Sequence, residues 1–423
     1  MARIMSIVYV HGVANRDDDP SYKPHLEEIT EFLNRYVGKD ISPSRSVVEA
    51  YWGKFGAAFA WDRESRPKSV LFGQGAPTAS NNFDRALAVA SIDGSQIPAV
   101  PTGSQGSSVL VPSGPAIGSA SLGPGIRLKD LSPEDLSDLL STVIVEGTAD
   151  PSTRAQMIIA ADDVAHDSAT PAALAKCATV QEELEKVRAM LDQKHVGVLV
   201  AQGTGIWSKI VDRVGEATSR AVSVPAYAVS TVVAETREPI NRMVTLFIGD
   251  LLAYLNTRKD STNPGPIPQL MMDTLDKAKK AAPNEPLIVL THSMGGQIVY
   301  DLVTHFLPKT QSTLRIDFWC ATASQVGLFE EMKLFLESSA QYSKVKGNKV
   351  PFPDQKYLGI WWNVWDHNDF ISYTARDIID GVDDQSYDSG VSLIKAHGEY
   401  LMRPSFYRKF ADKLAAAKAR NWR

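Results

Sequence analysis

Ser293 has the sequence surroundings of a serine nucleophile. It lies in PLIVLTHSMGGQIVY (286–300), where Leu287–Leu290 is short enough for a buried strand and the apolar residues after Gly296 recur at helical spacing. A strand that turns directly into a helix forces a tight bend with a strained residue at its tip. The bend would present the Ser293 hydroxyl and leave the Met294 N–H unpaired at the positive helix end. Nucleophilic attack on a carbonyl group needs both features.

Small residues must flank such a bend so that the strand and the helix can approach each other. Gly295 meets this need two residues after Ser293. Thr291 stands two residues before it, where glycine is commonest; threonine is small but is a departure. The alternative interpretation is an ordinary helix start with a serine in its first turn.

The strand, bend and helix around Ser293 resemble the nucleophile turn of the α/β-hydrolase superfamily, and more narrowly of its lipase- and esterase-like members. The resemblance implies an α/β fold with a mostly parallel central sheet flanked by helices. His292 then occupies the usual second position of the turn, and Ser293, Met294 and Gly295 follow as nucleophile, oxyanion donor and small residue.

A second mark of this superfamily is a strand that ends in His-Gly. Here Ile4–Val10 is rich in β-forming residues and is followed by His11, Gly12 and Val13. The resemblance implies that the Val13 N–H joins the Met294 N–H in an oxyanion hole, with His11 supporting the loop. Gly12 also makes physical sense, because the chain must bend there while its amide faces the substrate. Without the serine motif, an ordinary turn would be the simpler interpretation.

A serine hydroxyl needs an imidazole to accept its proton, and that imidazole needs a third group to fix its tautomer. In this superfamily the chain order is serine, acid, histidine. His367 and His397 follow the predicted helix after Ser293, and the segment KAHGEY around His397 resembles the last motif of the superfamily. His397 is therefore the predicted base.

The acid should follow a late strand, and Tyr357–Trp365 is the predicted strand. Asp369-Phe370-Ile371 resembles the Asp-Pro-Ile of relatives, with Phe370 in place of proline, which favours Asp369 as the acid. Asp366 is the alternative acid. Either aspartate could instead only cap the following turn.

The predicted elements divide the chain into a core and an insertion. Residues 1–52 form the first part of the core, residues 53–238 an inserted cap, and residues 239–423 the remainder of the core with the triad. Segment 72–127 is rich in Gly, Pro and Ser and is predicted to be irregular. The other predicted elements are strands 46–52 and 314–321 and helices 25–37, 133–145, 154–164, 172–194, 240–255, 267–281, 329–336 and 404–421. A separate domain with its own function is the alternative to a cap.

Composition favours a globular protein and disfavours a nucleic-acid partner. The 423 residues are 44% hydrophobic and 22% charged, with a net charge of −5. Cys177 and Cys320 lack metal-ligand spacing, and the acidic run Asp17–Asp19 is better explained as a solvated loop. No apolar run reaches the ~18 residues of a membrane span. We expect a cytoplasmic protein without a metal or organic cofactor.

The expected function is hydrolysis of a carboxylic ester, acyl or lipid, through an acyl-enzyme on Ser293. Segment Trp207–Val233 is a candidate for peripheral lipid contact, although ordinary internal packing is slightly favoured. Two alternatives stay open: a catalytically inactive scaffold with the same fold, and an acyltransferase with the same triad. The sequence selects neither the acyl chain, nor ester over thioester or amide, nor the oligomeric state.

Overall fold

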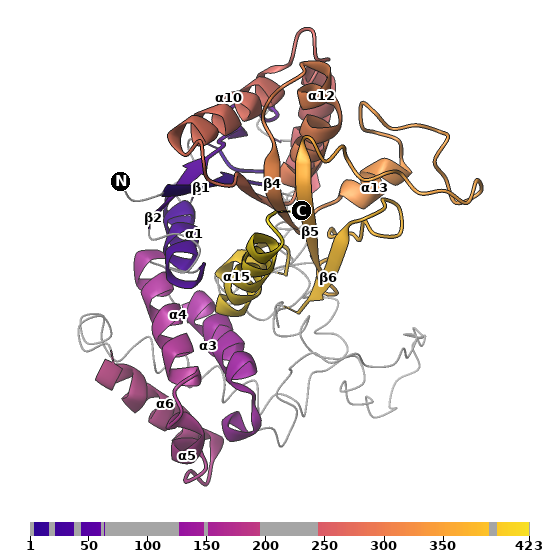
Figure 1. Ribbon diagram of the computed structural model, residues 1–423. Helices are drawn as coiled ribbons and strands as arrows, with labels where there is room; N and C mark the ends of the chain where they lie inside the picture. The colour runs from indigo at the N-terminus through magenta and orange to yellow at the C-terminus, as the bar shows by residue number, and fades with distance from the viewer. Residues whose placement is uncertain are drawn as a thin grey trace, which may run out of the picture.

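The computed structural model describes residues 4–16, 22–37, 44–60, 63, 127–147, 151–194, 244–388 and 396–422. The predicted lipid-contact segment and nearly all of the Gly/Pro/Ser-rich segment 72–127 lie outside the described residues. Figure 1 shows a central sheet with helices on both sides and a group of further helices at one end.

The sheet has six strands, and every neighbouring pair is parallel. The strands are β1 (Ile4–Val10), β2 (Ser44–Glu49), β3 (Ile288–His292), β4 (Ile316–Thr322), β5 (Leu358–Asp366) and β6 (Asp383–Tyr387). Their order in the sheet is β2-β1-β3-β4-β5-β6, so the direction of chain winding reverses between β1 and β3. In open parallel sheets, ligands bind beyond the carboxyl ends of the strands at such a reversal. His11 follows β1 and Ser293 follows β3 at this point.

Alternating side chains of the strands enter two separate cores, one on each face of the sheet. Ile7 and Leu290 pack on the face covered by α1 (Tyr22–Tyr36) and α15 (Pro404–Ala419). Val8 and Val289 pack on the opposite face, against α10 (Pro266–Ala281) and α11 (Gly295–Asp301). Both faces are therefore buried, which explains the nearly continuous apolar runs of β1 and β3.

Helices continue on the second face. The helix α11 runs into a π-helical segment, η5 (Leu302–Phe306), and then α12 (Leu307–Lys309), and residues 244–257 are also helical. In Figure 1, α10 and α12 lie above the sheet and α1 and α15 below it. The remaining short elements are η1 (Gly53–Phe55), η3 (Leu128–Asp130), α13 (Val326–Glu331), α14 (Ala396–Glu399) and η6 (Tyr400–Met402).

The described part of the predicted insertion between residues 127 and 194 is mostly helical and packs on the core. It comprises α3 (Pro133–Gly147), α4 (Pro151–Ala165), α5 (Thr170–Leu174) and α6 (Val180–Lys194), drawn in magenta in Figure 1. The helices α3 and α4 contact α1 and α15. Two buried carboxylates anchor them: Glu28 of α1 accepts both bonds of the Arg154 fork at 2.8 Å, and Asp162 of α4 pairs with Arg408 of α15.

One predicted helix, 172–194, is two helices. The chain leaves the helical conformation after Ala175 and starts again at Val180. The Thr179 hydroxyl accepts the Glu182 N–H at 3.1 Å, and the Glu182 carboxylate accepts the Ala178 N–H at 2.6 Å. This reciprocal capping satisfies helix-end donors and starts a new helix, so the local signal prevails over the continuous periodicity.

The strand β6 was not predicted, and β2 begins and ends earlier than the predicted strand 46–52. The β6 residues are mostly polar, as is common on an edge strand that pairs on one side only. Trp52 lies outside β2, and its backbone N–H bonds the side chain of His11 rather than a neighbouring strand.

None of the described helices combines the length and the apolar character needed to span a bilayer.

Candidate active site

Ser293 sits at a strained turn between β3 and α11. Its φ is +52°, in the left-handed region that residues other than glycine rarely adopt. The Ser293 N–H donates to the Thr322 carbonyl at 2.9 Å, which holds the turn against the end of β4. A Cβ on Gly295 would come within 2.6 Å of the Val10 carbonyl oxygen, so only glycine allows this approach of α11 to β1. The turn therefore has the tight geometry predicted from its small residues.

Thr291 occupies the position where glycine was expected, and its side chain has a structural partner. The Trp319 indole N–H donates to the Thr291 hydroxyl at 3.0 Å, and both residues are fully buried. A buried indole N–H without an acceptor would cost about 1–3 kcal/mol. The departure at Thr291 thus satisfies a donor on β4 without blocking the turn.

His397 lies beside the serine. The His397 Nε2 is 2.8 Å from the Ser293 Oγ, and the two residues come from α14 and from the turn after β3. Ser293 has no exposed surface, whereas 12% of the His397 side chain is exposed. A ligand atom therefore reaches the hydroxyl only after groups around the serine move.

Asp369 completes the arrangement on the other side of the imidazole. The His397 Nδ1 lies 2.9 Å from the Asp369 Oδ2 and 3.1 Å from its Oδ1. Asp369 also accepts the Tyr400 hydroxyl at 3.1 Å and the Ile371 N–H at 3.1 Å, which fix the carboxylate in the turn after β5. The alternative acid, Asp366, is also buried, but its Oδ1 accepts the Asn368 N–H at 2.8 Å.

The loop after β1 is held close to the serine turn. A Cβ on Gly12 would lie 2.9 Å from the Ser293 Cβ, so the absence of a side chain permits the contact. The Gly12 carbonyl accepts the His11 Nδ1–H at 2.6 Å and the Asn15 amide at 3.1 Å. Because the peptide is trans, the Val13 N–H points away from those two donors.

Two backbone donors near Ser293 are available for a ligand. Within the described part of the chain, neither the Val13 N–H nor the Met294 N–H makes a hydrogen bond. Met294 is the N-cap residue of α11, where the helix dipole is positive. These are the two groups that the sequence predicts for an oxyanion hole.

The two histidines that precede motif residues, His11 and His292, are neutral; His11 is buried and His292 is half-buried. Burial lowers the pKa of His11 to about 4; its Nε2 accepts the Trp52 N–H at 3.0 Å and its ring stacks on that indole. Burial and the neighbouring His397 lower the pKa of His292 to about 3. The His292 Nε2–H donates to the backbone carbonyl of His397 at 2.5 Å, which ties the serine turn to α14. The sequence assigned both residues only supporting roles, and these contacts are structural.

Several supporting residues were not identified from the sequence. The Thr322 carbonyl holds the serine turn, and the Trp52 backbone N–H holds the His11 ring. Backbone groups are the same in every residue, so these contacts leave no signal in the sequence. The Asn15 amide donates to the carbonyls of Gly12 and Val13 in the loop after β1; its position four residues after His11 was the available clue. Tyr400 was part of the recognised segment after His397, but its bond to the acid was not foreseen.

The described residues contain no cluster of three or more His, Cys, Asp or Glu that could bind a metal ion, and Asp17–Asp19 lie outside them.

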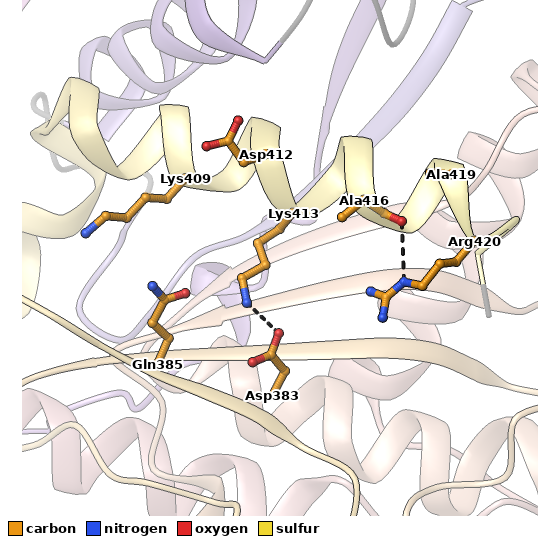
Figure 2. Close-up of a pocket in the computed structure, with 8 residues that line it drawn as sticks. All are labelled: Asp383, Gln385, Lys409, Asp412, Lys413, Ala416, Ala419 and Arg420. Carbon is orange, nitrogen blue, oxygen red and sulfur yellow. Dashed lines mark hydrogen bonds and ion pairs between the residues drawn. The ribbon is translucent and has the colours of Figure 1, made fainter.

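A surface pocket of about 720 Å³ lies between α15 and β6, away from Ser293. Figure 2 shows Lys409, Lys413 and Asp383 on its walls, with Lys413 paired to Asp383 at 2.6 Å. No triad residue lines this pocket.

Comparisons of the chain with protein-family models, curated proteins and solved structures found no match.

Proposed function

We propose that the protein is a serine hydrolase of the α/β-hydrolase fold that cleaves carboxylic esters. The observation that carries the proposal is the continuous chain of contacts from the Ser293 hydroxyl through His397 to Asp369, at 2.8 and 2.9 Å. The winding reversal between β1 and β3, with the Val13 N–H after β1 and the serine after β3, supports the same fold.

In the first half of the reaction, the Ser293 Oγ attacks the ester carbonyl carbon and the His397 Nε2 accepts its proton. The oxyanion is bound by the N–H groups of Val13 and Met294, each typically worth ~10²–10³ in rate. Collapse of the tetrahedral intermediate breaks the bond to the alcohol oxygen, which takes the proton from His397. Asp369 keeps the His397 Nδ1 protonated and stabilises the imidazolium that forms.

In the second half, water attacks the acyl-enzyme and gives its proton to His397. The second tetrahedral intermediate collapses, the Ser293 oxygen regains the proton, and the carboxylic acid leaves. Every proton transfer uses the same imidazole nitrogen, so apart from the attacking water this pathway uses only side chains and backbone groups of this chain.

The inserted helices are proposed to act as a cap that shapes the acyl site. Their anchoring to α1 and α15 through Glu28 and Asp162 supports a fixed placement on the core. The burial of Ser293 requires groups around it to move for access. The same burial is what favours the second candidate, a protein that keeps the fold and binds ligands without turnover.

The test uses purified full-length protein and 4-nitrophenyl esters of graded acyl length, together with a fluorophosphonate probe. We expect ester hydrolysis and covalent labelling of Ser293. Ser293→Ala should abolish the labelling and reduce kcat by about 10⁵–10⁶. A wild-type protein that neither hydrolyses any ester nor reacts with the probe would favour the binding protein.

A further inference from the structure

Asp250 is a buried carboxylate that contacts the loop after β1. It lies in the helical segment 244–257, has no exposed surface, and is 236 residues from its partner Ala14 in the chain. Its Oδ2 accepts the Ala14 N–H at 2.8 Å and the Arg16 Nη1–H at 3.1 Å. Its Oδ1 accepts the Ala57 N–H at 2.8 Å and the second Arg16 nitrogen.

These contacts hold a segment that would otherwise be unfavourable. Ala14 has φ +68°, a conformation that costs a non-glycine residue roughly 1–3 kcal/mol. The Ala14 N–H belongs to the peptide that follows Val13, and the carbonyl of that same peptide accepts the Asn15 amide at 3.1 Å. Asp250 and Asn15 therefore fix both ends of the peptide directly after the oxyanion-hole residue.

The surroundings of Asp250 are built for this carboxylate. Burying a charge is costly unless it is paired and hydrogen-bonded, and the Arg16 fork supplies the opposite charge. A Cβ on Gly56 would lie 2.6 Å from the Asp250 Oδ1 and 2.7 Å from the Arg16 Cζ. Glycine at this position lets segment 53–57 approach the ion pair, so three separate parts of the chain converge on one side chain.

We propose that Asp250 is a positioning residue that holds the oxyanion-hole loop in its active conformation through Ala14 and Arg16. The role rests on the proposed function, because it matters for catalysis only if the Val13 N–H binds an oxyanion. Asp250 does not itself touch the reacting atoms. Its effect should therefore fall on kcat, where the oxyanion forms, and leave KM nearly unchanged.

The decisive variant is Asp250→Asn. Each carboxylate oxygen of Asp250 accepts one backbone N–H and one Arg16 N–H. In either orientation of an asparagine amide, its NH₂ group would therefore face two donors and could bond neither. We expect kcat for a 4-nitrophenyl ester to fall about 10- to 100-fold, less than the complete loss of one oxyanion donor. Hydrogen–deuterium exchange of the peptide that contains residues 11–16 should become faster, because the Ala14 amide loses its acceptor.

Asp301→Asn is the matched control. Asp301 is also fully buried, is paired with an arginine, Arg258, and accepts the Leu336 N–H and the Tyr254 hydroxyl, but none of its partners belongs to the loop after β1. It should lower thermal stability as Asp250→Asn does, while kcat and the exchange of residues 11–16 stay at wild-type values. If Asp250→Asn fails to fold, Arg16→Lys keeps the positive charge but loses the fork. It should show the same selective fall in kcat, several-fold in size.

The two proposals fail in different ways. If the wild type is active, Ser293→Ala is inactive, and Asp250→Asn keeps its kcat and its exchange rate, the role of Asp250 is refuted and the hydrolase stands. Equal losses in Asp250→Asn and Asp301→Asn would also refute it, because a general loss of stability would explain both. A wild type without esterase activity refutes the hydrolase and the positioning role with it.

Discussion

Asp369 holds His397 with both of its carboxylate oxygens, at 2.9 and 3.1 Å from the imidazole Nδ1. This contact places the proton on Nδ1 and leaves the lone pair of Nε2 directed at the Ser293 hydroxyl. The tautomer that the proposed general base needs is thus set by a residue in the turn after β5, on a different element from His397.

The identity of the acid can be tested with two neighbouring variants. Asp369→Asn should lower kcat/KM by about 10⁴, because an amide no longer favours the Nδ1-protonated tautomer or the imidazolium. Asp366→Asn should leave kcat/KM near the wild-type value, because the Asn oxygen can still accept the Asn368 N–H. Steady-state kinetics with one ester decide between them, and the reverse ranking would make Asp366 the acid.

The loop after β1 lies so close to the serine turn that one added methyl group at Gly12 should lower activity. Gly12→Ala places a Cβ 2.9 Å from the Ser293 Cβ and 3.0 Å from the His292 Nδ1, so the serine turn or the loop after β1 must shift. A displaced oxyanion donor should lower kcat about 10²-fold. Gly398→Ala is the control, because its Cβ would meet no atom within 4 Å although it adjoins His397. Equal kinetics of the two variants would contradict the predicted crowding at Gly12.

The tight turn at Ser293 was predictable because its signals are local. The strand, bend and helix around Ser293 follow one another within fifteen residues, and each has its own periodicity. The choice of His397 and Asp369 needed the order implied by the resemblance, since no local pattern marks a loop histidine as a base. The strand β6 was not predicted, because its sequence has neither an apolar run nor a clean alternation of polar and apolar residues.

The supporting contacts were unpredictable for a different reason. Asp250 and Ala14 come together only when the helical segment 244–257 packs near β1, and this placement depends on the whole fold. Trp52 looked like a strand residue because it is apolar and follows a β-branched run. Its N–H instead satisfies the His11 Nε2, which no propensity encodes.

The buried histidine His11 predicts a loss of stability in acid. Its folded pKa of about 4 lies below the unfolded value of 6.5, so the unfolded chain binds more protons between these pH values. Its contribution to stability is full above pH 6.5 and is lost as the pH falls towards 4, with a slope of up to about 1.4 kcal/mol per pH unit. His11→Gln should remove this slope relative to wild type in urea unfolding measured at several pH values.

Asp138 provides a control of opposite sign. Burial raises its pKa to about 6, so the folded chain binds the extra proton between pH 3.8 and 6. Its contribution is present at low pH and is lost as the pH rises through 6. Asp138→Asn should therefore make the acid loss of stability steeper, whereas His11→Gln makes it shallower. Parallel curves for His11→Gln and wild type would show that His11 is not buried neutral.

His292 should act on catalysis through the backbone of His397. Its Nε2–H donates to the His397 carbonyl at 2.5 Å, and the ring centroids lie 4.9 Å apart. His292→Phe keeps an aromatic ring but removes the donor, which frees the carbonyl and loosens the imidazole relative to Ser293. Because misplacement of a catalytic group by about 1 Å can cost 10²-fold, we expect kcat/KM to fall by about one to two orders of magnitude.

His292→Gln separates this hydrogen bond from the packing of the ring. The glutamine amide nitrogen can reach about the position of the imidazole Nε2, and an amide N–H is a competent donor to a carbonyl. We therefore expect His292→Gln to recover most of the kcat/KM that His292→Phe loses, although it has no ring to pack against His397. If His292→Phe is the more active of the two, ring packing rather than the bond to the His397 carbonyl positions the base. Because the pKa of His292 is about 3, its ring stays neutral above pH 5, and the ranking of the two variants should be the same from pH 6 to 9.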